Sequence, residues 1–218
     1  RRDIKLPKNQ MDHQRKVAED RKNGKKVVAV VTGGSPVELG EVEKHADAIV
    51  MVWYSGEAGG DALADLLFGK EDFTGRLPVT FPTSADVLPD FCDYSMAGRT
   101  YKYQTKGIAY PFGHGLSYAT FASANVKVKA KGEGEAVSVE VRNTGDRDGV
   151  AVVQLYVSTP NAGKGAPIKS LVGFRRVPVK AGGTQTVEFE VSPRQLMEFG
   201  EDGVPRRVPG ECVYTVQL

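Results

Sequence analysis

The sequence contains no apolar run that approaches the roughly 20 residues needed to cross a bilayer as a helix. Its first ten residues, RRDIKLPKNQ, include basic side chains, but no hydrophobic stretch follows them. We therefore expect neither a membrane segment nor a signal peptide within this sequence. Because the sequence also lacks an initial methionine, we expect it to be a processed product or an internal fragment.

Cysteine is equally scarce, with only Cys92 and Cys212 among 218 residues. The two lie far apart in a chain that is long enough to fold without covalent crosslinks. A disulfide is compatible with this pattern but is not required by it, and two buried free thiols are the preferred interpretation. Cysteine usage therefore leaves the cellular compartment open.

The composition excludes low-complexity and collagen-like chains, because 25 glycines and 12 prolines in 218 residues indicate many turns and nothing more. A chain of this length forms one large domain or two small ones and hides about 70% of its unfolded surface. The net charge is +2, although residues 1–26 hold ten basic and four acidic side chains. No aromatic residues that could stack on bases are interleaved with these basic residues, so we expect no nucleic-acid partner.

The first third of the sequence alternates helical and strand-like segments. Val27–Val31 and Ala48–Tyr54 are continuous apolar runs, typical of parallel strands that are buried on both faces. Helical patterns cover residues 9–21, 41–45 and 61–68, and the first of these ends at Asn23-Gly24. The pattern predicts an α/β domain with a mainly parallel sheet. Two strand–helix units cannot cover both edges of such a sheet, so we expect an upstream segment to complete it.

The character of the sequence changes after Gly75. Residues 76–121 are rich in proline, glycine and tyrosine, and only Arg76–Phe81 is convincingly extended, so we predict a long ordered linker packed on both neighbouring domains. From residue 122, short alternating strands predict an antiparallel β-sandwich. The predicted domains are residues 1–75, 76–121 and 122–218. We expect the aromatic side chains of the sandwich strands to face the core, namely Tyr156, Phe174, Phe189 and Tyr214.

Residue chemistry alone yields no catalytic set, cofactor or metal site. Thr32-Gly33-Gly34-Ser35 follows a strand but lacks the spacing of a phosphate-binding loop. The three histidines, His13, His45 and His114, have no partner at metal-ligand spacing, and a structural role is preferred for His114. Three carboxylates, Glu57, Asp61 and Asp65, gather near a strand–helix loop, but helix capping and solvent exposure explain the last two.

Four ordered segments nevertheless resemble a known family. They are KKVVAVVTGGSPVEL, WYSGEAGGDALADLLFGKEDFTGRLPVTFP, YSMAGRTYKY and YPFGHGLSYATF, and together with the opening RRDIKLPKNQ they are similar to the C-terminal part of glycoside hydrolase family three. The resemblance implies the latter half of an open α/β sandwich followed by a fibronectin type III-like β-sandwich, with an N-terminal barrel in the complete enzyme. It therefore implies an α/β domain followed by an all-β domain.

The resemblance also implies a function, namely retaining hydrolysis of terminal β-linked glucose or xylose from plant-type oligosaccharides. The Asp nucleophile and Glu acid/base of this two-carboxylate mechanism would lie upstream of Arg1, in the N-terminal barrel and the first half of the α/β domain, and the present chain alone would be inactive. The last two motifs are more similar to the xylosidase and arabinofuranosidase branch. Family members of this kind are usually exported, which implies a periplasmic or secreted location. Glu57 would be structural.

Three residues are candidates for contact with an oligosaccharide substrate. Arg1 would lie beside the acid/base loop and orient it, and Trp53 and Tyr54 could stack on a sugar ring or pack in the core. The alternative hypothesis is a non-catalytic β-sandwich module with an α/β stub that binds glycan or protein. A third is a flavodoxin-like regulatory domain, which the absence of acidic clusters at the strand ends disfavours.

Overall fold

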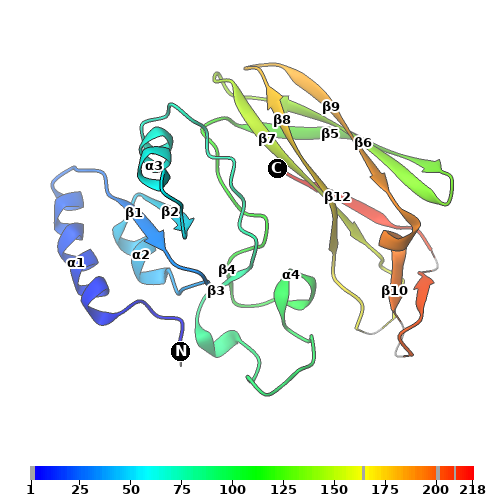
Figure 1. The fold of residues 1–218 in the computed structure, drawn as a ribbon, viewed down its shortest axis with the longest axis horizontal. Helices are drawn as coiled ribbons and strands as arrows, with labels where there is room; N and C mark the ends of the chain where they lie inside the picture. Colours follow the sequence, from blue (N-terminus) through cyan, green and yellow to red (C-terminus); the bar gives the residue numbers. More distant parts are fainter. Residues whose placement is uncertain (1–2, 164, 200–201, 209) are drawn as a thin grey trace. The chain divides into compact units, whose positions relative to one another are not determined.

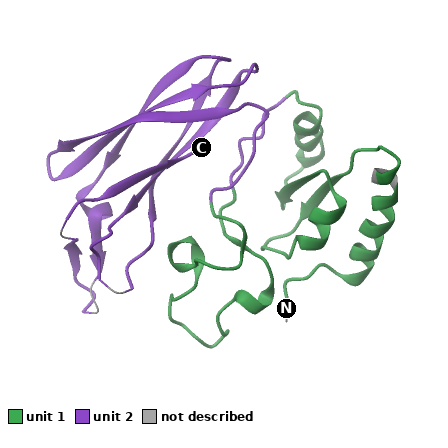
Figure 2. Cartoon of the chain, turned by 180° about the vertical axis from the view of Figure 1, so that it is seen from behind, with its two compact units in different colours: residues 1–70, 77–112 green, residues 71–76, 113–218 purple. Residues whose placement is uncertain are grey.

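The computed structural model describes residues 3–163, 165–199, 202–208 and 210–218. The chain divides into two compact units (Figure 2). Unit 1 contains residues 1–70 and 77–112, and unit 2 contains residues 71–76 and 113–218. Within the described residues, no helix combines the length and the apolar character needed to cross a membrane.

Unit 1 has the predicted α/β character (Figure 1). Strands β1 and β2 pair in parallel and are connected through helix α2, as the apolar runs indicated. A second, antiparallel pair consists of β3 and β4. The elements are α1 (Lys8–Lys22), β1 (Val28–Thr32), α2 (Gly40–His45), β2 (Ala48–Trp53), α3 (Gly59–Leu67), β3 (Phe81–Pro82), the 3-10 helix η1 (Ala85–Val87), α4 (Thr100–Tyr103) and β4 (Ile108–Tyr110).

The core of unit 1 is small, and β1 lies only partly inside it. Five side chains form its buried cluster, namely Val31, Val37, Leu39, Val42 and Phe81. Val28 and Val30 remain 44% and 41% exposed, so the prediction that this strand is buried on both faces is wrong. Residues two apart in a strand point to the same face of the sheet, and that face of β1 is only partly covered by the described residues.

Unit 2 is the predicted antiparallel sandwich, so the α/β plus all-β fold class is confirmed. One sheet has the order β5-β6-β9 and the other the order β12-β7-β8, and β10 and β11 form a separate hairpin. The strands are β5 (Phe121–Lys131), β6 (Gly134–Asn143), β7 (Gly149–Ser158), β8 (Ser170–Val179), β9 (Thr184–Val191), β10 (Met197–Phe199), β11 (Pro205–Arg207) and β12 (Val213–Gln217), with a 3-10 helix η2 (Pro193–Leu196) before β10.

The core between these sheets consists mainly of valine. Val139, Val141, Val153 and Leu155 are completely buried in it. Phe189 is buried in this core and the partly buried Tyr214 packs against it, as predicted. Tyr156 is fully buried but does not belong to this cluster, and its hydroxyl donates to Oε1 of Gln154 at 2.9 Å. Phe174 is 59% exposed, which corrects its assignment to the core.

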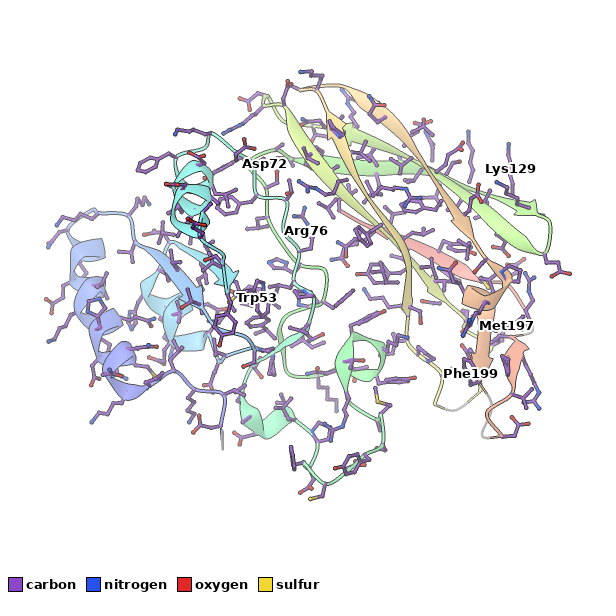
Figure 3. All side chains as sticks on the ribbon, viewed as in Figure 1. Trp53, Asp72, Arg76, Lys129, Met197 and Phe199 are labelled. Carbon is purple, nitrogen blue, oxygen red and sulfur yellow. The ribbon has the colours of Figure 1, made fainter. Side chains whose placement is uncertain are left out.

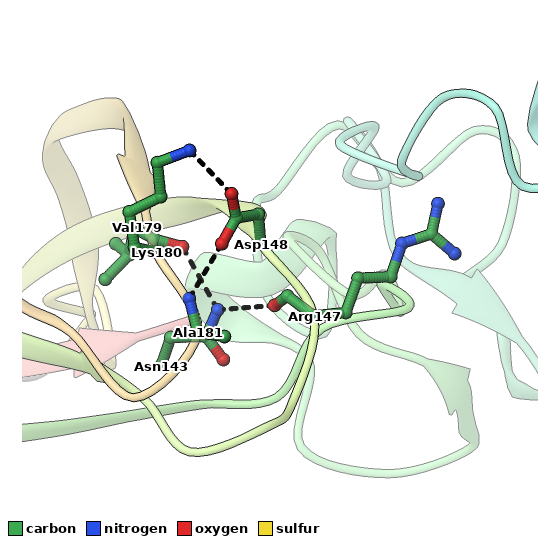
Figure 4. A network of polar contacts seen from close by, with 6 residues as sticks. All are labelled: Asn143, Arg147, Asp148, Val179, Lys180 and Ala181. Atoms are coloured by element: carbon green, nitrogen blue, oxygen red, sulfur yellow. Dashed lines mark hydrogen bonds and ion pairs between the residues drawn. The ribbon is translucent and has the colours of Figure 1, made fainter.

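A buried asparagine fixes the turn between β6 and β7 (Figure 4). Asn143 is fully buried, and its amide donates hydrogen bonds to the carbonyl oxygens of Arg147, at 2.8 Å, and Val179, at 3.1 Å. Nearby, Lys180 forms an ion pair with Asp148 at 2.6 Å. The amide satisfies backbone carbonyls that would otherwise be buried without a donor.

Candidate functional site

The carboxyl ends of β1 and β2 form one edge of the parallel sheet. Thr32 at the end of β1 pairs with Trp53 at the end of β2, and the Gly33 amide donates a hydrogen bond of 3.3 Å to the Trp53 carbonyl. The two strands then continue into the loops 33–39 and 54–58. Open α/β sheets bind ligands outside the carboxyl ends of their strands, so this edge is the candidate site of unit 1.

Trp53 occupies this edge in a strained backbone conformation. Its φ angle is +51°, which is unusual for a bulky side chain. Its indole packs edge-on against Phe81, with ring centroids 6.1 Å apart and planes at 65° (Figure 3 labels Trp53). Trp53 contacts the buried cluster of unit 1, so its ring contributes to the core.

The side chain of Tyr54 differs from that of Trp53 in its exposure to solvent. Its side chain is 82% exposed. Its ring lies directly over Gly34, because a Cβ atom at Gly34 would come within 2.7 Å of the tyrosine Cε2. A glycine at this position therefore permits close approach of the ring to the first loop. Of the two aromatic candidates, Tyr54 offers the accessible ring face.

The three carboxylates near this edge have separate surroundings. Glu57 and Asp61 are exposed, and Asp65 forms an ion pair of 2.9 Å with Lys70. No side chain caps the amino end of α3, but Asp61 lies in its first turn, where its charge is favourable to the helix dipole. The helix-dipole part of the prediction for Asp61 agrees with this position, and the capping part is wrong.

Two of the three histidines approach one cavity that their sequence spacing did not indicate. His13 of α1 and His45 of α2 both line a cavity of about 260 Å³ beside β1. His114 belongs to unit 2, where burial and then the charge of Arg76 lower its pKa. Among the described residues, no group of three or more histidine, cysteine or acidic side chains has the arrangement of a metal site.

Asp72 organises unit 2 and was not among the predicted residues (Figure 3 labels it). Its carboxylate accepts hydrogen bonds from the Ser117 hydroxyl, at 2.9 and 2.7 Å, and from the Tyr118 amide, at 2.9 Å. The Val150 amide of β7 approaches the same carboxylate at 3.4 Å. Asp72 therefore joins residues 71–76 to the segment that precedes β5.

Two further predictions concern Arg1 and the cysteines. Arg1 lies outside the described residues, so its predicted contact with the acid/base loop stays a prediction. Both cysteines are free, but Cys92 is exposed, so the prediction that both thiols are buried is wrong for this residue. Cys212 is partly buried, and burial raises the pKa of its thiol.

Comparison with protein families gives two consecutive matches. The model of the glycosyl hydrolase family 3 C-terminal domain matches residues 1–118, and that of a fibronectin type III-like domain matches residues 151–218. Among curated proteins, a xylan 1,4-beta-xylosidase of Xylanibacter ruminicola is 40% identical over 97% of this chain and 24% of its own length. A periplasmic beta-glucosidase of Salmonella typhimurium is 36% identical over 97% of this chain and 29% of its own length.

Solved structures show the same likeness. A family 3 beta-glucosidase of Bifidobacterium adolescentis superimposes with a TM-score of 0.86 and 32% identity, over 98% of this chain and 33% of that one. A beta-glucosidase of Erythrobacter marinus gives a TM-score of 0.85 and 35% identity, over 100% of this chain and 29% of that one. The chain thus spans about a quarter to a third of the relatives it matches.

Proposed function

Because the chain belongs to the glycosyl hydrolase family 3 C-terminal domain family, we propose that it is the C-terminal part of a retaining β-glycosidase. The enzyme removes terminal β-linked glucose or xylose from plant-type oligosaccharides. The observation that carries this proposal is the family match over residues 1–118, followed in order by the fibronectin type III-like match. A non-catalytic binding module is disfavoured, since the relatives are named as xylosidases and glucosidases.

The catalytic carboxylates belong to polypeptide that precedes this chain in the complete enzyme. Retaining hydrolysis needs two carboxyl groups about 5–5.5 Å apart. Glu57 and Asp61 are exposed and Asp65 is ion-paired with Lys70, so we assign neither catalytic role to these three residues. The two-stranded sheet supports the same proposal, because β1 pairs only with β2 among the described residues and the half-exposed Val28 and Val30 would be covered by further elements of a complete α/β domain.

The partners and location follow from this proposal. The N-terminal barrel and the first half of the α/β domain accompany this chain, in one polypeptide or as a separate chain, and the enzyme binds an oligosaccharide. We place it in the periplasm or outside the cell, supported by the name of the Salmonella relative. The domain division at residues 75 and 121 belongs to the same proposal, and limited proteolysis with mass mapping of the fragments would test it.

The test of function compares this chain with the longer polypeptide that its gene encodes. Aryl β-xyloside and aryl β-glucoside serve as substrates in parallel assays. We expect turnover by the longer polypeptide and none by the 218-residue chain. Turnover by the short chain, or failure of the longer one to hydrolyse either substrate, would contradict the proposal.

Tyr54 is the residue of this chain that we propose to line the substrate cleft, whereas Trp53 shapes the turn beneath it and Arg1 orients the acid/base loop. The exposed ring of Tyr54 at the carboxyl edge of the sheet supports the assignment. In the complete enzyme, Tyr54→Ala should raise KM for an oligosaccharide by roughly 10-fold, since aromatic stacking contributes about 0.5–1.5 kcal/mol. Phe68→Ala is the matched control, because Phe68 is 84% exposed in the same unit. Equal KM values for the two variants would remove Tyr54 from the cleft.

A further inference from the structure

A loop of unit 1 displays the most exposed large apolar and aromatic side chains among the described residues. It runs from Leu88 to Gly98, between η1 and α4 (Figure 1). Phe91 is 91% exposed and Tyr94 is 90% exposed. Leu88 and Met96, near the ends of the loop, are 44% and 49% exposed. Such a concentration of exposed apolar surface marks an interaction site.

The shape of this loop does not depend on those aromatic rings. The guanidinium of Arg99 donates to three loop carbonyls, those of Asp90 at 2.8 Å, Asp93 at 2.6 Å and Ser95 at 3.2 Å. The Asp90 and Asp93 carboxylates accept from the amides of Cys92, at 2.7 Å, and Ser95, at 2.8 Å. The loop is therefore ordered before any partner binds, which reduces the entropy cost of association.

Both ends of the loop line a cleft of about 520 Å³. Its walls include Leu88, Pro89 and Met96 from the loop, and Tyr101 and Phe112, whose rings stack with centroids 4.2 Å apart. We call Phe91, Tyr94, Met96 and this cleft the docking surface. It lies entirely within unit 1.

The chemistry of the docking surface favours a protein over a sugar. The cleft has no carboxylate in its lining, Nε and Nη2 of Arg99 donate to the loop, and the Gln104 amide donates to the Lys106 carbonyl at 3.1 Å. The lining also contains the polar side chains of Thr80 and Lys102. Few groups are left to bind sugar hydroxyls. Exposed aromatic and methionine side chains are, by contrast, enriched in protein interfaces. The Thr80 hydroxyl in the cleft wall is buried without a hydrogen-bond partner among the described atoms, and a docked polypeptide could supply one.

We propose that this docking surface binds the part of the glycosidase polypeptide that lies outside the present chain. The inference rests on the proposed function, because the occupant is the remainder of that enzyme. The matched relatives place 71–76% of their length outside the region shared with this chain, since the chain spans 29% and 24% of them. A polypeptide of that size is present at equal stoichiometry and offers the area that a stable interface needs.

Cys92 provides a probe inside the loop, between the two exposed rings. Its thiol is exposed and free, whereas Cys212 in unit 2 is partly buried and serves as the internal reference. The experiment compares the rates at which iodoacetamide alkylates each thiol, read by peptide mass mapping, in the 218-residue chain and in the longer polypeptide. We expect Cys92 to react on the order of tenfold more slowly in the longer polypeptide, because its surface is covered there. The rate ratio for Cys212 should stay near one.

Two double variants separate docking from a general loss of structure. Phe91→Ser with Tyr94→Ser should restore fast alkylation of Cys92 in the longer polypeptide, because aromatic hot spots dominate interfaces. The matched control is Phe174→Ser with Phe199→Ser, which removes two rings of unit 2 that are 59% and 67% exposed (Figure 3 labels Phe199). This control should leave Cys92 protected from alkylation in the longer polypeptide. Both variants of the 218-residue chain should melt at the temperature of the unchanged chain, since none of these rings is buried.

Every outcome decides the proposal. Equal rates of Cys92 alkylation in the two polypeptides would overturn the proposal. Slow alkylation of Cys92 in the short chain, together with a dimer mass by light scattering, would also overturn it. Protection of the short chain by millimolar xylotriose or cellotriose would assign the surface to glycan instead. Glycosidase activity is scored separately: an active enzyme with an unprotected Cys92 refutes only the docking surface, and a protected but inactive one refutes only the proposed function.

Discussion

At the scale of single residues, the strongest polar anchor in unit 2 is Asp72. Three donors converge on its carboxylate, namely the Ser117 hydroxyl and the amides of Tyr118 and Val150. Removing the carboxylate leaves these donors without their acceptor in a partly buried site. Asp72→Ala should therefore destabilise unit 2 by about 2–4 kcal/mol. Calorimetry should show its melting temperature lowered by roughly 10 °C.

Two matched variants test the origin of that loss. Asp72→Asn keeps one acceptor oxygen and the shape of the side chain, so it should lose about half as much stability. Asp146→Ala removes an exposed carboxylate of the same unit and should change stability by less than about 0.5 kcal/mol. If all three variants melted together, Asp72 would have no anchoring role.

Predictions for single residues succeeded where neighbouring residues in the sequence determine the environment, and they failed where contacts between distant residues determine it. The alternative of core packing for Trp53 follows from its place at the end of an apolar run, and its ring does contact the core. The Asp72 contact with Ser117 spans 45 positions in the sequence, and no spacing rule joins two such residues. The exposure of Cys92 was missed because it depends on the shape of a loop whose carbonyls accept hydrogen bonds from Arg99.

At the scale of elements, the pairing of β3 with β4 contains an ionisable group that makes unit 1 sensitive to alkali. Burial, and then the hydrogen bond from its hydroxyl to Glu43 of α2, raise the pKa of Tyr110 to about 12. The protonated tyrosine is favoured by the fold, so its contribution is complete below the unfolded pKa of about 10 and is lost as the pH rises toward 12. Solvent screening limits this contribution to about 1 kcal/mol.

The single tryptophan reports this effect, because Trp53 packs on Phe81, the residue that pairs with Tyr110. Urea unfolding followed by Trp53 fluorescence at pH 8 and pH 11.5 should show a larger loss of stability in the unchanged chain than in Tyr110→Phe. The phenylalanine variant keeps the ring and removes the titrating hydroxyl. Parallel losses in the two proteins would assign the alkaline sensitivity to other groups.

Long periodic elements were predictable and short ones were not. The antiparallel strands from residue 122 onward were predictable as a class, since alternation over many positions is a strong signal. Arg76–Phe81 was expected to be extended, but the structure assigns a strand only to Phe81–Pro82, paired with Ile108–Tyr110. The three-residue strands β10 and β11 were also missed. Strands this short contain too few positions to show a period.

At the scale of the whole molecule, the change of sequence character at Gly75 predicts a domain boundary, and this division stays a prediction. Residues 71–76 belong to unit 2, although they directly follow the last helix of the α/β part. Tertiary contacts decide this, because Asp72 binds Ser117 and the Arg176 guanidinium donates to Thr74 at 2.8 Å. The family resemblance is visible in the sequence because its motifs are contiguous, whereas the docking surface depends on side-chain exposure in the folded chain.

The two units should unfold separately in the 218-residue chain. The buried cluster of unit 1 contains five residues and that of unit 2 contains twelve, and hydrophobic stabilisation scales with the apolar area removed from water. Unit 1 should therefore melt first, and Trp53 fluorescence should report a lower transition than the far-UV circular dichroism of the sandwich. Asp72→Ala should lower only the upper transition temperature and Tyr110→Phe should affect only the lower one.

In the longer polypeptide, the added strands and the covered docking surface should raise the lower transition temperature toward the upper one. Coincident transitions in the short chain would mean that unit 1 is stable with its two-stranded sheet alone, and the need for further strands would then be refuted.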